Sequence, residues 1–244
     1  LYLGGFVAIL SGLSRLRLNN AKIAQSNFIE IKLTEEIMII VGELINASRK
    51  SVGTAIENND VEAIKKLALD QAENGADYID VNAGVFVGKE ADYLKWLVET
   101  VQTAADKPCS IDSPDPRAIE TALAVHKGTP LINSISLEKE RYDALLPIVA
   151  GTDFKVVALC MSDAGMPETA DDRMAIADKL INSLLQKNVP VENIYVDPLV
   201  QPVATNSDFG TKFLKTIEII MTTFKGIHTM CGLSNISFGL PERK

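Results

Sequence analysis

The feature that most constrains the fold is an alternation, from residue 37 onward, of short Val- and Ile-rich runs with longer amphipathic stretches. Repeated units of this kind build a parallel sheet whose strands are connected by helices. We predict strands over residues 37–42, 77–83, 108–112, 130–135, 154–160, 193–199 and 227–234. We predict helices over residues 57–75, 90–105, 115–127, 138–150, 171–187 and 208–224.

Seven strands and six helices in this order indicate a TIM (β/α)8 barrel that is truncated after strand seven. A complete barrel has eight strands and eight helices in about 250 residues. Such a truncated barrel would expose a strand edge and apolar helix faces. A doubly wound open sheet is the alternative, but the segment after the first strand reads GELINASRK and contains no GxGxxG turn.

The segment before the barrel has a different character. Residues 1–13 form an apolar run, which is shorter than the roughly 20 residues that span a bilayer. No basic stretch precedes this run, as it would in a signal peptide, and residues 14–36 are polar and irregular. We therefore expect residues 1–36 to be a leader or extension of uncertain structure, and residues 37–244 to be a C-terminally incomplete barrel domain.

Charge and cysteine usage exclude several classes of function. The net charge is −8 and the isoelectric point is about 4.9, so the chain lacks the basic surface that nucleic acid or an anionic membrane requires. Three cysteines lie far apart in the sequence and form no CxxC motif. We expect no disulfide framework and no metal site, and the reducing cytoplasm is the compartment that fits this cysteine usage.

Polar residues follow the carboxyl ends of six predicted strands, which is where a barrel builds its active site. Each one alone could cap a helix or form an Asx turn. Together they predict a cup of acceptors and amides with few basic groups, which suits a flat, donor-rich heterocycle better than a phosphate. These residues are Glu43, Asn46, Asp80, Asn82, Asp112, Ser113, Asn133, Ser134, Asp197, Ser234 and Asn235.

The ordered set of motifs at these strand ends resembles the pterin-binding barrel family. The closest branch is that of the methyltetrahydrofolate–corrinoid protein methyltransferases, and the folate domain of cobalamin-dependent methionine synthase is a cousin. The resemblance covers about residues 37–239. It rests on GELIN (42–46), DVNAG (80–84), SIDS (110–113), INS (132–134), DPL (197–199) and GLSNIS (232–237).

The resemblance implies a substrate and a set of contacts. Asp112, Asn133 and Asp197 would bind the ring and amino nitrogens of the pterin, and Asn235 would reach the nitrogen that carries the methyl group. Methyltetrahydrofolate would be the methyl donor, and the acceptor would be the cobalt of a corrinoid that a partner protein supplies. Members of the family are commonly homodimers. The remaining residues expected to line the substrate site are Glu43, Asn46, Asp80, Asn82 and Ser234.

The chemistry of methyl transfer fits these residue types. A methyl group on a tertiary amine is a poor electrophile, and protonation of that nitrogen makes the leaving group neutral, which is worth about 10²–10⁴-fold in rate. A carboxamide does not titrate, so Asn235 would bind the developing N–H while waters and carboxylates deliver the proton. We predict Asn235 and Asp112 as the catalytic residues, and we expect no Ser, Cys or His nucleophile.

Two other enzymatic or binding functions stay open. A dihydropteroate synthase of the same family would carry basic residues at the last strand end, where this chain has Ser234, Asn235 and Ile236. A non-catalytic pterin- or corrinoid-binding fragment is the other alternative. We expect His126, His228 and Cys109 to be structural rather than functional.

Overall fold

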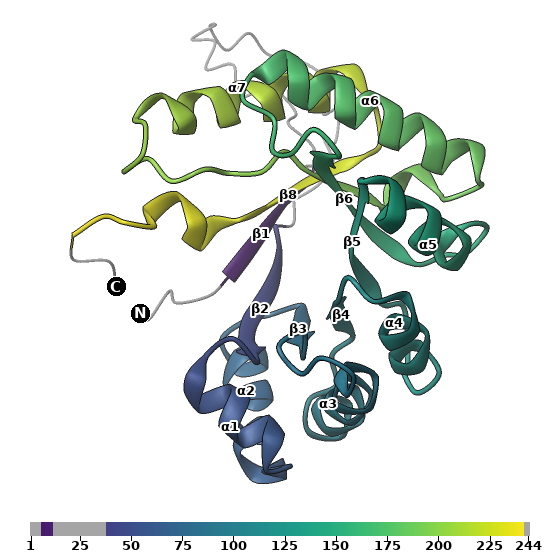
Figure 1. The fold of residues 1–244 in the computed structure, drawn as a ribbon, viewed down its shortest axis with the longest axis vertical. Helices are drawn as coiled ribbons and strands as arrows, with labels where there is room; N and C mark the ends of the chain where they lie inside the picture. The colour runs from purple at the N-terminus through teal and green to yellow at the C-terminus, as the bar shows by residue number, and fades with distance from the viewer. Residues whose placement is uncertain (1–5, 12–37, 242–244) are drawn as a thin grey trace, which may run out of the picture.

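The computed structural model describes residues 6–11 and 38–241, which form one barrel surrounded by helices (Figure 1). The strands are β1 Phe6–Ser11, β2 Ile39–Asn46, β3 Tyr78–Asn82, β4 Cys109–Asp112, β5 Leu131–Leu137, β6 Lys155–Ser162, β7 Ile194–Asp197 and β8 His228–Gly232. The helices are α1 Lys50–Glu57, α2 Val61–Glu73, α3 Glu90–Ala104, α4 Pro116–Leu123, α5 Lys139–Val149, α6 Ala170–Gln186 and α7 Asp208–Thr223. Two 3-10 segments, η1 Val191–Asn193 and η2 Leu233–Ser237, precede β7 and follow β8.

The seven predicted parallel strands are present and adjacent in chain order from β2 to β8. The sheet nevertheless closes, because β1 lies antiparallel between β2 and β8. Phe6 is paired with Gly42 on one side, and Val7 is paired with Gly232 on the other. The expectation of an exposed strand edge is therefore wrong: backbone from the predicted leader covers both edges. The rest of residues 1–36 lies outside the described part of the chain.

One helix was missed at the sequence level. We predicted a single helix over residues 57–75, but α1 begins already at Lys50, and a turn at Asn58 and Asn59 separates it from α2. Asn59 has a φ of 50°, a left-handed conformation that ends a helix. Gly53 lowers the helical propensity of this short segment, so the sequence pattern resembles a loop.

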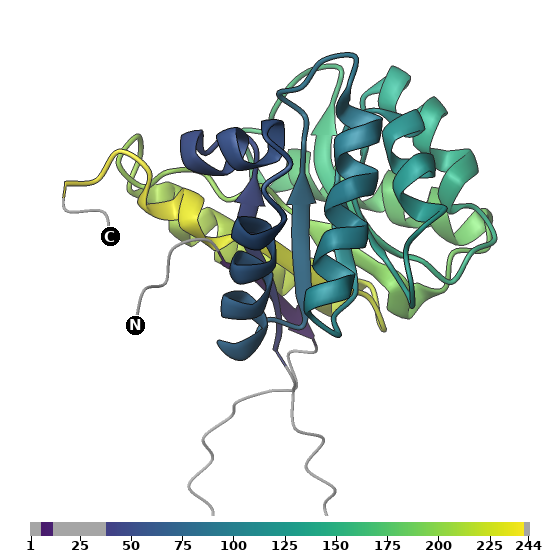
Figure 2. The ribbon, with the colours of Figure 1, turned by 90° about the horizontal axis from the view of Figure 1, so that it is seen from below.

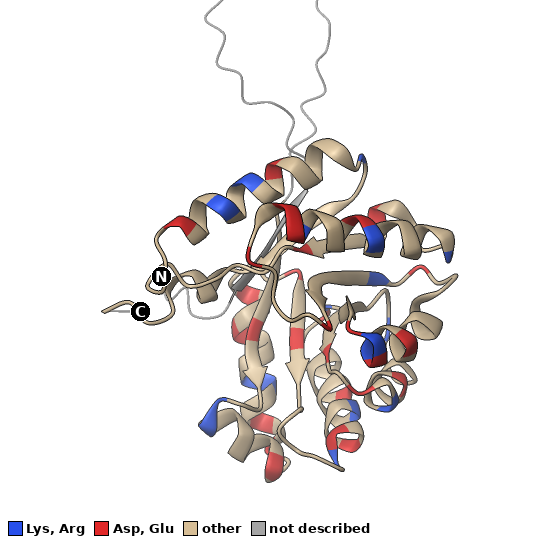
Figure 3. Ribbon diagram, turned by 45° about the horizontal axis from the view of Figure 1, so that its top comes forward, with Lys and Arg blue, Asp and Glu red and all other residues tan. Residues whose placement is uncertain are grey.

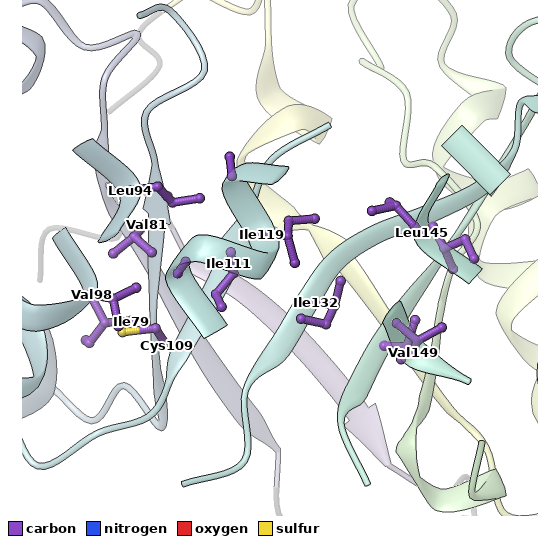
Figure 4. Close-up of a cluster of buried hydrophobic side chains, with 14 of the residues drawn as sticks. Ile79, Val81, Leu94, Val98, Cys109, Ile111, Ile119, Ile132, Leu145 and Val149 are labelled. Carbon is purple, nitrogen blue, oxygen red and sulfur yellow. The ribbon is translucent and has the colours of Figure 1, made fainter. Parts of the chain in front are cut away.

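The strand residues divide by parity into two layers. One set, with Ile79, Val81, Cys109 and Ile111, packs outward against the helices and is fully buried (Figure 4). Figure 2 shows the helices lying along the outside of the strands. The other set points into the barrel and closes its floor with Val41, Tyr78, Leu131, Val157, Tyr195 and Met230.

The polar cup follows directly from this floor. Side chains alternate with period two along a strand, so the residue two positions beyond a floor residue also faces the barrel interior. Two positions after Tyr78, Leu131 and Tyr195 stand Asp80, Asn133 and Asp197. The interior is therefore apolar at the amino ends of the strands and polar at their carboxyl ends, and Figure 3 marks acidic residues on the strands themselves.

Candidate active site

Four carboxyl groups from four different strands gather in the barrel interior. The charges of Asp112 and Glu43 help to raise the pKa of Asp80, and those of Asp112 and Asp197 help to raise the pKa of Glu43. The strands β2, β3 and β4 are neighbours and β7 lies across the barrel from them, so these side chains face a common space. The convergence that we predicted from strand ends is thus present for these four residues.

Amide and hydroxyl groups orient two of these carboxyls. Asn82 Nδ2 donates a hydrogen bond of 2.8 Å to Asp112 Oδ2. Ser110 Oγ donates to Asp80 Oδ1 at 2.6 Å, and Asn133 Nδ2 donates to the same oxygen at 3.4 Å. Each bond leaves a second carboxylate oxygen free to accept from a ligand. Asn82 and Asn133 therefore lie inside the predicted cup, as neighbours of the acids rather than isolated strand-end residues.

Burial raises the pKa values of these acids. Loss of hydration, reinforced by neighbouring carboxylates, raises the pKa of Glu43 to about 7, and Arg49 opposes the shift. Burial likewise raises the pKa of Asp197 to about 7, against the hydrogen bond from the Leu199 amide. The pKa values of Asp80 and Asp112 are also raised, mainly by burial. The cup therefore holds protons near neutral pH and can both donate hydrogen bonds and accept them.

An irregularity in β2 places Glu43. The pairing of β2 with β3 shifts register between Gly42 and Ile45, and the Leu44 amide donates instead to Gln71 Oε1 at 2.8 Å. Gln71 belongs to α2 and is 2% exposed. A Cβ on Gly42 would lie 2.5 Å from Gln71 Oε1, so only glycine leaves room for this contact. The motif GELIN at 42–46 thus encodes a bulge, a feature that strand periodicity alone could not reveal.

A buried arginine supports the loop after Asp197. Arg173 in α6 is 1% exposed, and its Nε donates to the Pro198 carbonyl oxygen at 2.8 Å. Its other nitrogens donate to the Thr169 carbonyl oxygen and to Gln201 Oε1, both at 3.1 Å. Sequence analysis missed this residue, because a helical Arg next to two Asp residues reads as surface charge.

A second basic residue lies close to the cup. Arg141 in α5 lowers the pKa of Asp112, partly offsetting the effect of burial. Its Nε is buried and has no hydrogen-bond partner among the described residues. Arg141 also lines a groove of about 600 Å³ beside the barrel mouth, together with Pro114, Pro116, Glu138, Glu140, Ala144 and Asp163. The mouth is therefore less devoid of cations than the strand-end pattern suggested.

Other predicted site residues are engaged locally. Asn46 Oδ1 accepts hydrogen bonds from the amide and the hydroxyl of Ser48, at 2.9 and 2.6 Å. Asn46 therefore forms an Asx turn, which is the local role that a strand-end Asn commonly has. Ser113 Oγ donates to Glu90 Oε1 of α3 at 2.5 Å. Ser134 is buried at 5% exposure in β5, directly after Asn133.

The last strand delivers Asn235 to the rim rather than into the cup. Ser234 and Asn235 lie in η2, and Asn235 is exposed. Its side chain folds back over the end of β8, so that a Cβ on Gly232 would come within 2.8 Å of Asn235 Nδ2. Asn235 therefore lies at the rim, beside the end of β8.

The remaining candidates stay away from the mouth. His126 Nε2 accepts the Cys109 amide at 2.9 Å, and His228 stacks on the floor residue Tyr195 with ring centroids 4.8 Å apart. The three cysteines are buried, and none of them forms a disulfide. Within the described residues, no group of three or more His, Cys, Asp or Glu side chains could hold a metal ion. No described helix is long and apolar enough to cross a membrane.

Comparison with known proteins assigns the family. The family model described as "Pterin binding enzyme" matches residues 42–243. The chain belongs to this family. The resemblance predicted from the strand-end motifs is therefore confirmed.

Two curated relatives of this pterin-binding enzyme are informative. It is 38% identical over 209 residues to the methylcorrinoid:tetrahydrofolate methyltransferase of Eubacterium limosum, a match that covers 85% of this chain and 77% of the relative. It is 30% identical over 216 residues to the methionine synthase of Mycobacterium tuberculosis, covering 83% of this chain but only 18% of that protein.

Solved structures give the same fold. Dihydropteroate synthase from Xanthomonas albilineans in complex with 7,8-dihydropteroate superposes with a TM-score of 0.58 at 19% identity, over 73% of this chain and 68% of that chain. A second structure of that enzyme, with 4-aminobenzoic acid, gives a TM-score of 0.56 at 19% identity, over 75% of this chain and 70% of that chain. At this identity the similarity concerns the barrel fold alone.

Proposed function

We propose that this pterin-binding enzyme transfers a methyl group between N5 of tetrahydrofolate and the cobalt of a corrinoid carried by a partner protein. The observation that carries the proposal is the convergence of Asp80, Asp112 and Asp197 with the amides of Asn82 and Asn133 in one buried cup. Carboxyl and carboxamide groups of this kind pair with the amino and ring N–H groups of a pterin. The similarity to the methylcorrinoid:tetrahydrofolate methyltransferase of Eubacterium limosum supports the choice of reaction.

The direction of transfer needs no separate site. The sequence resemblance implies methyltetrahydrofolate as the donor, whereas the name of the Eubacterium limosum relative makes tetrahydrofolate the acceptor. Both directions pass through one transition state, so the same residues serve both. In that state Asp112, Asn133 and Asp197 hold the ring, while Asn235 reaches N5 from the rim. The supply of methylated and unmethylated partners then decides the net flow.

The site requires little else from the protein. The corrinoid cobalt supplies the nucleophile for methyl removal, so the enzyme must bind and orient the pterin and move one proton at N5. The exposed position of Asn235 leaves the methyl group accessible to a corrinoid that approaches along the barrel axis. We further propose a homodimer that works in the cytoplasm, where the three thiols stay reduced.

Calorimetric titration with methyltetrahydrofolate tests the proposal, with dihydropterin pyrophosphate as the comparison ligand. We expect micromolar binding of the folate and, on mixing with free cob(I)alamin, formation of methylcobalamin together with tetrahydrofolate. A preference for the pyrophosphate compound would assign the chain to dihydropteroate synthesis instead. Folate binding without any methyl transfer to cob(I)alamin would indicate a non-catalytic binding protein.

A further inference from the structure

Glu43 differs from the other acids of the cup in its hydrogen bonds. Asp80 accepts from Ser110, Asp112 accepts from Asn82, and Asp197 Oδ1 accepts from the Leu199 amide at 2.8 Å. The Glu43 carboxyl makes no hydrogen bond to any residue that the structure describes, although it is largely buried. Its two oxygens are therefore available to a ligand or water in the barrel interior, and pterin anchoring by the other acids does not require them.

Glu43 lies within the β2 bulge, and its carboxyl is near the charges of Asp112 and Asp197 in the barrel interior. Gly42 and Gly232 are paired with the consecutive β1 residues Phe6 and Val7, so Glu43 follows a point that lies one strand away from β8. Gly232 leads into η2, where Asn235 stands. A single strand, β1, therefore separates the strand that carries Glu43 from the strand that leads to Asn235.

From this placement we propose that Glu43 is the catalytic acid that exchanges the proton at N5 of the folate, a role that rests on the proposed methyl transfer. When methyltetrahydrofolate is the donor, the Glu43 carboxyl gives its proton to N5, the N5–CH₃ bond breaks, and the cobalt(I) electron pair forms the new cobalt–carbon bond. The products are tetrahydrofolate with an N5–H, the methylated corrinoid and the Glu43 carboxylate. In the reverse direction the carboxylate takes that proton back.

The charges around Glu43 suit this exchange. Asp112 in β4, Asp197 in β7 and Asp80 in β3 face it from the barrel interior, and Arg49 faces it from the loop before α1. The segment that forms β1 contains no titratable residue, and His228 of β8 lies at the barrel floor. Burial favours the protonated form, the charges of Asp112 and Asp197 add to this effect and Arg49 opposes it, which leaves the pKa of Glu43 at about 7. An acid with this pKa is close to half protonated at neutral pH and can give or take a proton.

Single-turnover methyl transfer to free cob(I)alamin, followed from pH 5.5 to 8.5, tests the role with Glu43→Gln. We expect the variant to bind methyltetrahydrofolate nearly as tightly as the parent chain, and to transfer the methyl group about 10²–10⁴-fold more slowly. The parent rate should fall as the pH rises through about 7, and this fall should be missing in Glu43→Gln.

Glu43→Asp, which keeps an acid, should recover part of the rate and the pH dependence. Glu73→Gln, a change of an exposed acid at the end of α2, is the matched control.

A donor that needs no proton separates this role from a structural one. In 5,5-dimethyltetrahydropterin N5 is already quaternary and positively charged, so its methyl group leaves with a neutral amine. Glu43→Gln should transfer from this donor at close to the parent rate. Equal slowing with both donors, or an unchanged pH profile in Glu43→Gln, would overturn the assignment to Glu43. A parent chain that transfers no methyl group from either donor would instead overturn the proposed function itself.

Discussion

At the scale of single residues, the proposed methyl transfer assigns binding to some acids of the cup and proton transfer to another. Asp80 and Asp112 accept hydrogen bonds from neighbouring side chains, which fix their orientation. Such pre-oriented groups hold a ring in ground state and transition state alike, so their loss weakens binding more than it slows the bound substrate. In the proposed reaction Asn235 reaches the reacting nitrogen from the exposed rim, so we expect its contribution to grow as charge develops there.

This division predicts different defects in two variants. Asp112→Ala should weaken methyltetrahydrofolate binding strongly, because the ring loses a charged partner worth about 1.5–3 kcal/mol. Asn235→Ala should weaken binding only modestly and reduce methyl transfer at saturating folate to a larger extent. Calorimetry and single-turnover kinetics on both variants would measure the two effects. Equal losses of affinity and rate in both would contradict the assigned roles.

The raised pKa of Asp197 predicts a pH-dependent stability. Its folded pKa of about 7 exceeds the ordinary value of 3.8, so the folded state binds this proton more tightly than the unfolded state does. The contribution of Asp197 is therefore fully present below pH 4 and is lost as the pH rises toward 7, by about 2–4 kcal/mol.

Asp197→Asn tests this linkage, because the amide oxygen can still accept from Leu199. The variant should be more stable than the parent at pH 8, and the difference should shrink toward pH 5. Urea unfolding at several pH values would measure it. A difference that stayed constant across this range would show that Asp197 titrates normally in the folded chain.

At the scale of elements, side chains from the helices shape the strand ends. The side chain of Gln71 in α2 accepts a hydrogen bond from the Leu44 amide at the β2 bulge. Gln71→Leu keeps a side chain of similar size but leaves that amide unpaired, which should cost about 1–3 kcal/mol. Since the bulge directs Glu43, methyl transfer should fall as well. Gln102→Leu in α3 is the control, because it removes a glutamine that hydrogen-bonds the backbone of Lys127. This variant should lose stability but keep its transfer rate per folded molecule.

Arg173 of α6 has the corresponding role at β7. Its guanidinium satisfies the Pro198 and Thr169 carbonyl groups, so Arg173→Met should loosen the loop that follows Asp197. We expect a loss of about 2–4 kcal/mol in stability, because polar groups that are now paired become buried without partners. Amide hydrogen exchange should increase first in residues 198–207. Uniform exchange across the barrel would argue instead for a global role of Arg173.

At the scale of the whole molecule, β1 turns an open sheet into a closed barrel. Its backbone is paired with β2 on one side and β8 on the other, so it protects two strand edges at once. Ala8 stands in the middle of this strand, opposite Ile40 and Cys231. A proline at this position cannot donate to the ladder.

Ala8→Pro should therefore lower the free energy of unfolding by at least about 1–3 kcal/mol and increase self-association through the freed edges. Ala8→Ser, which keeps the amide, is the control. Thermal unfolding and light scattering would measure both effects. Unchanged stability in Ala8→Pro would show that the barrel holds together without β1.

The sequence by itself determined the alternation of strands and helices, the parity of each strand and the family. These follow from local periodicity: Tyr78 and Asp80 share one face, and Ile79 and Val81 share the other, whatever surrounds them. The strand-end motifs then predicted the cup from Asp80 to Asp197, because parallel strands bring their carboxyl ends to one side.

Only the tertiary structure decided how the barrel closes and what each acid can do. The pairing of β1 joins residue 6 to residue 42 and residue 7 to residue 232, contacts between segments that no local pattern links. The bulge at Gly42 depends on Gln71 from another element. The pKa of Glu43 depends on the charges of Asp112 and Asp197, which are distant in the chain. Burial and long-range pairing are properties of the folded chain, so only the structure could show that Glu43, alone among the four acids of the cup, has no hydrogen-bond partner among the described residues.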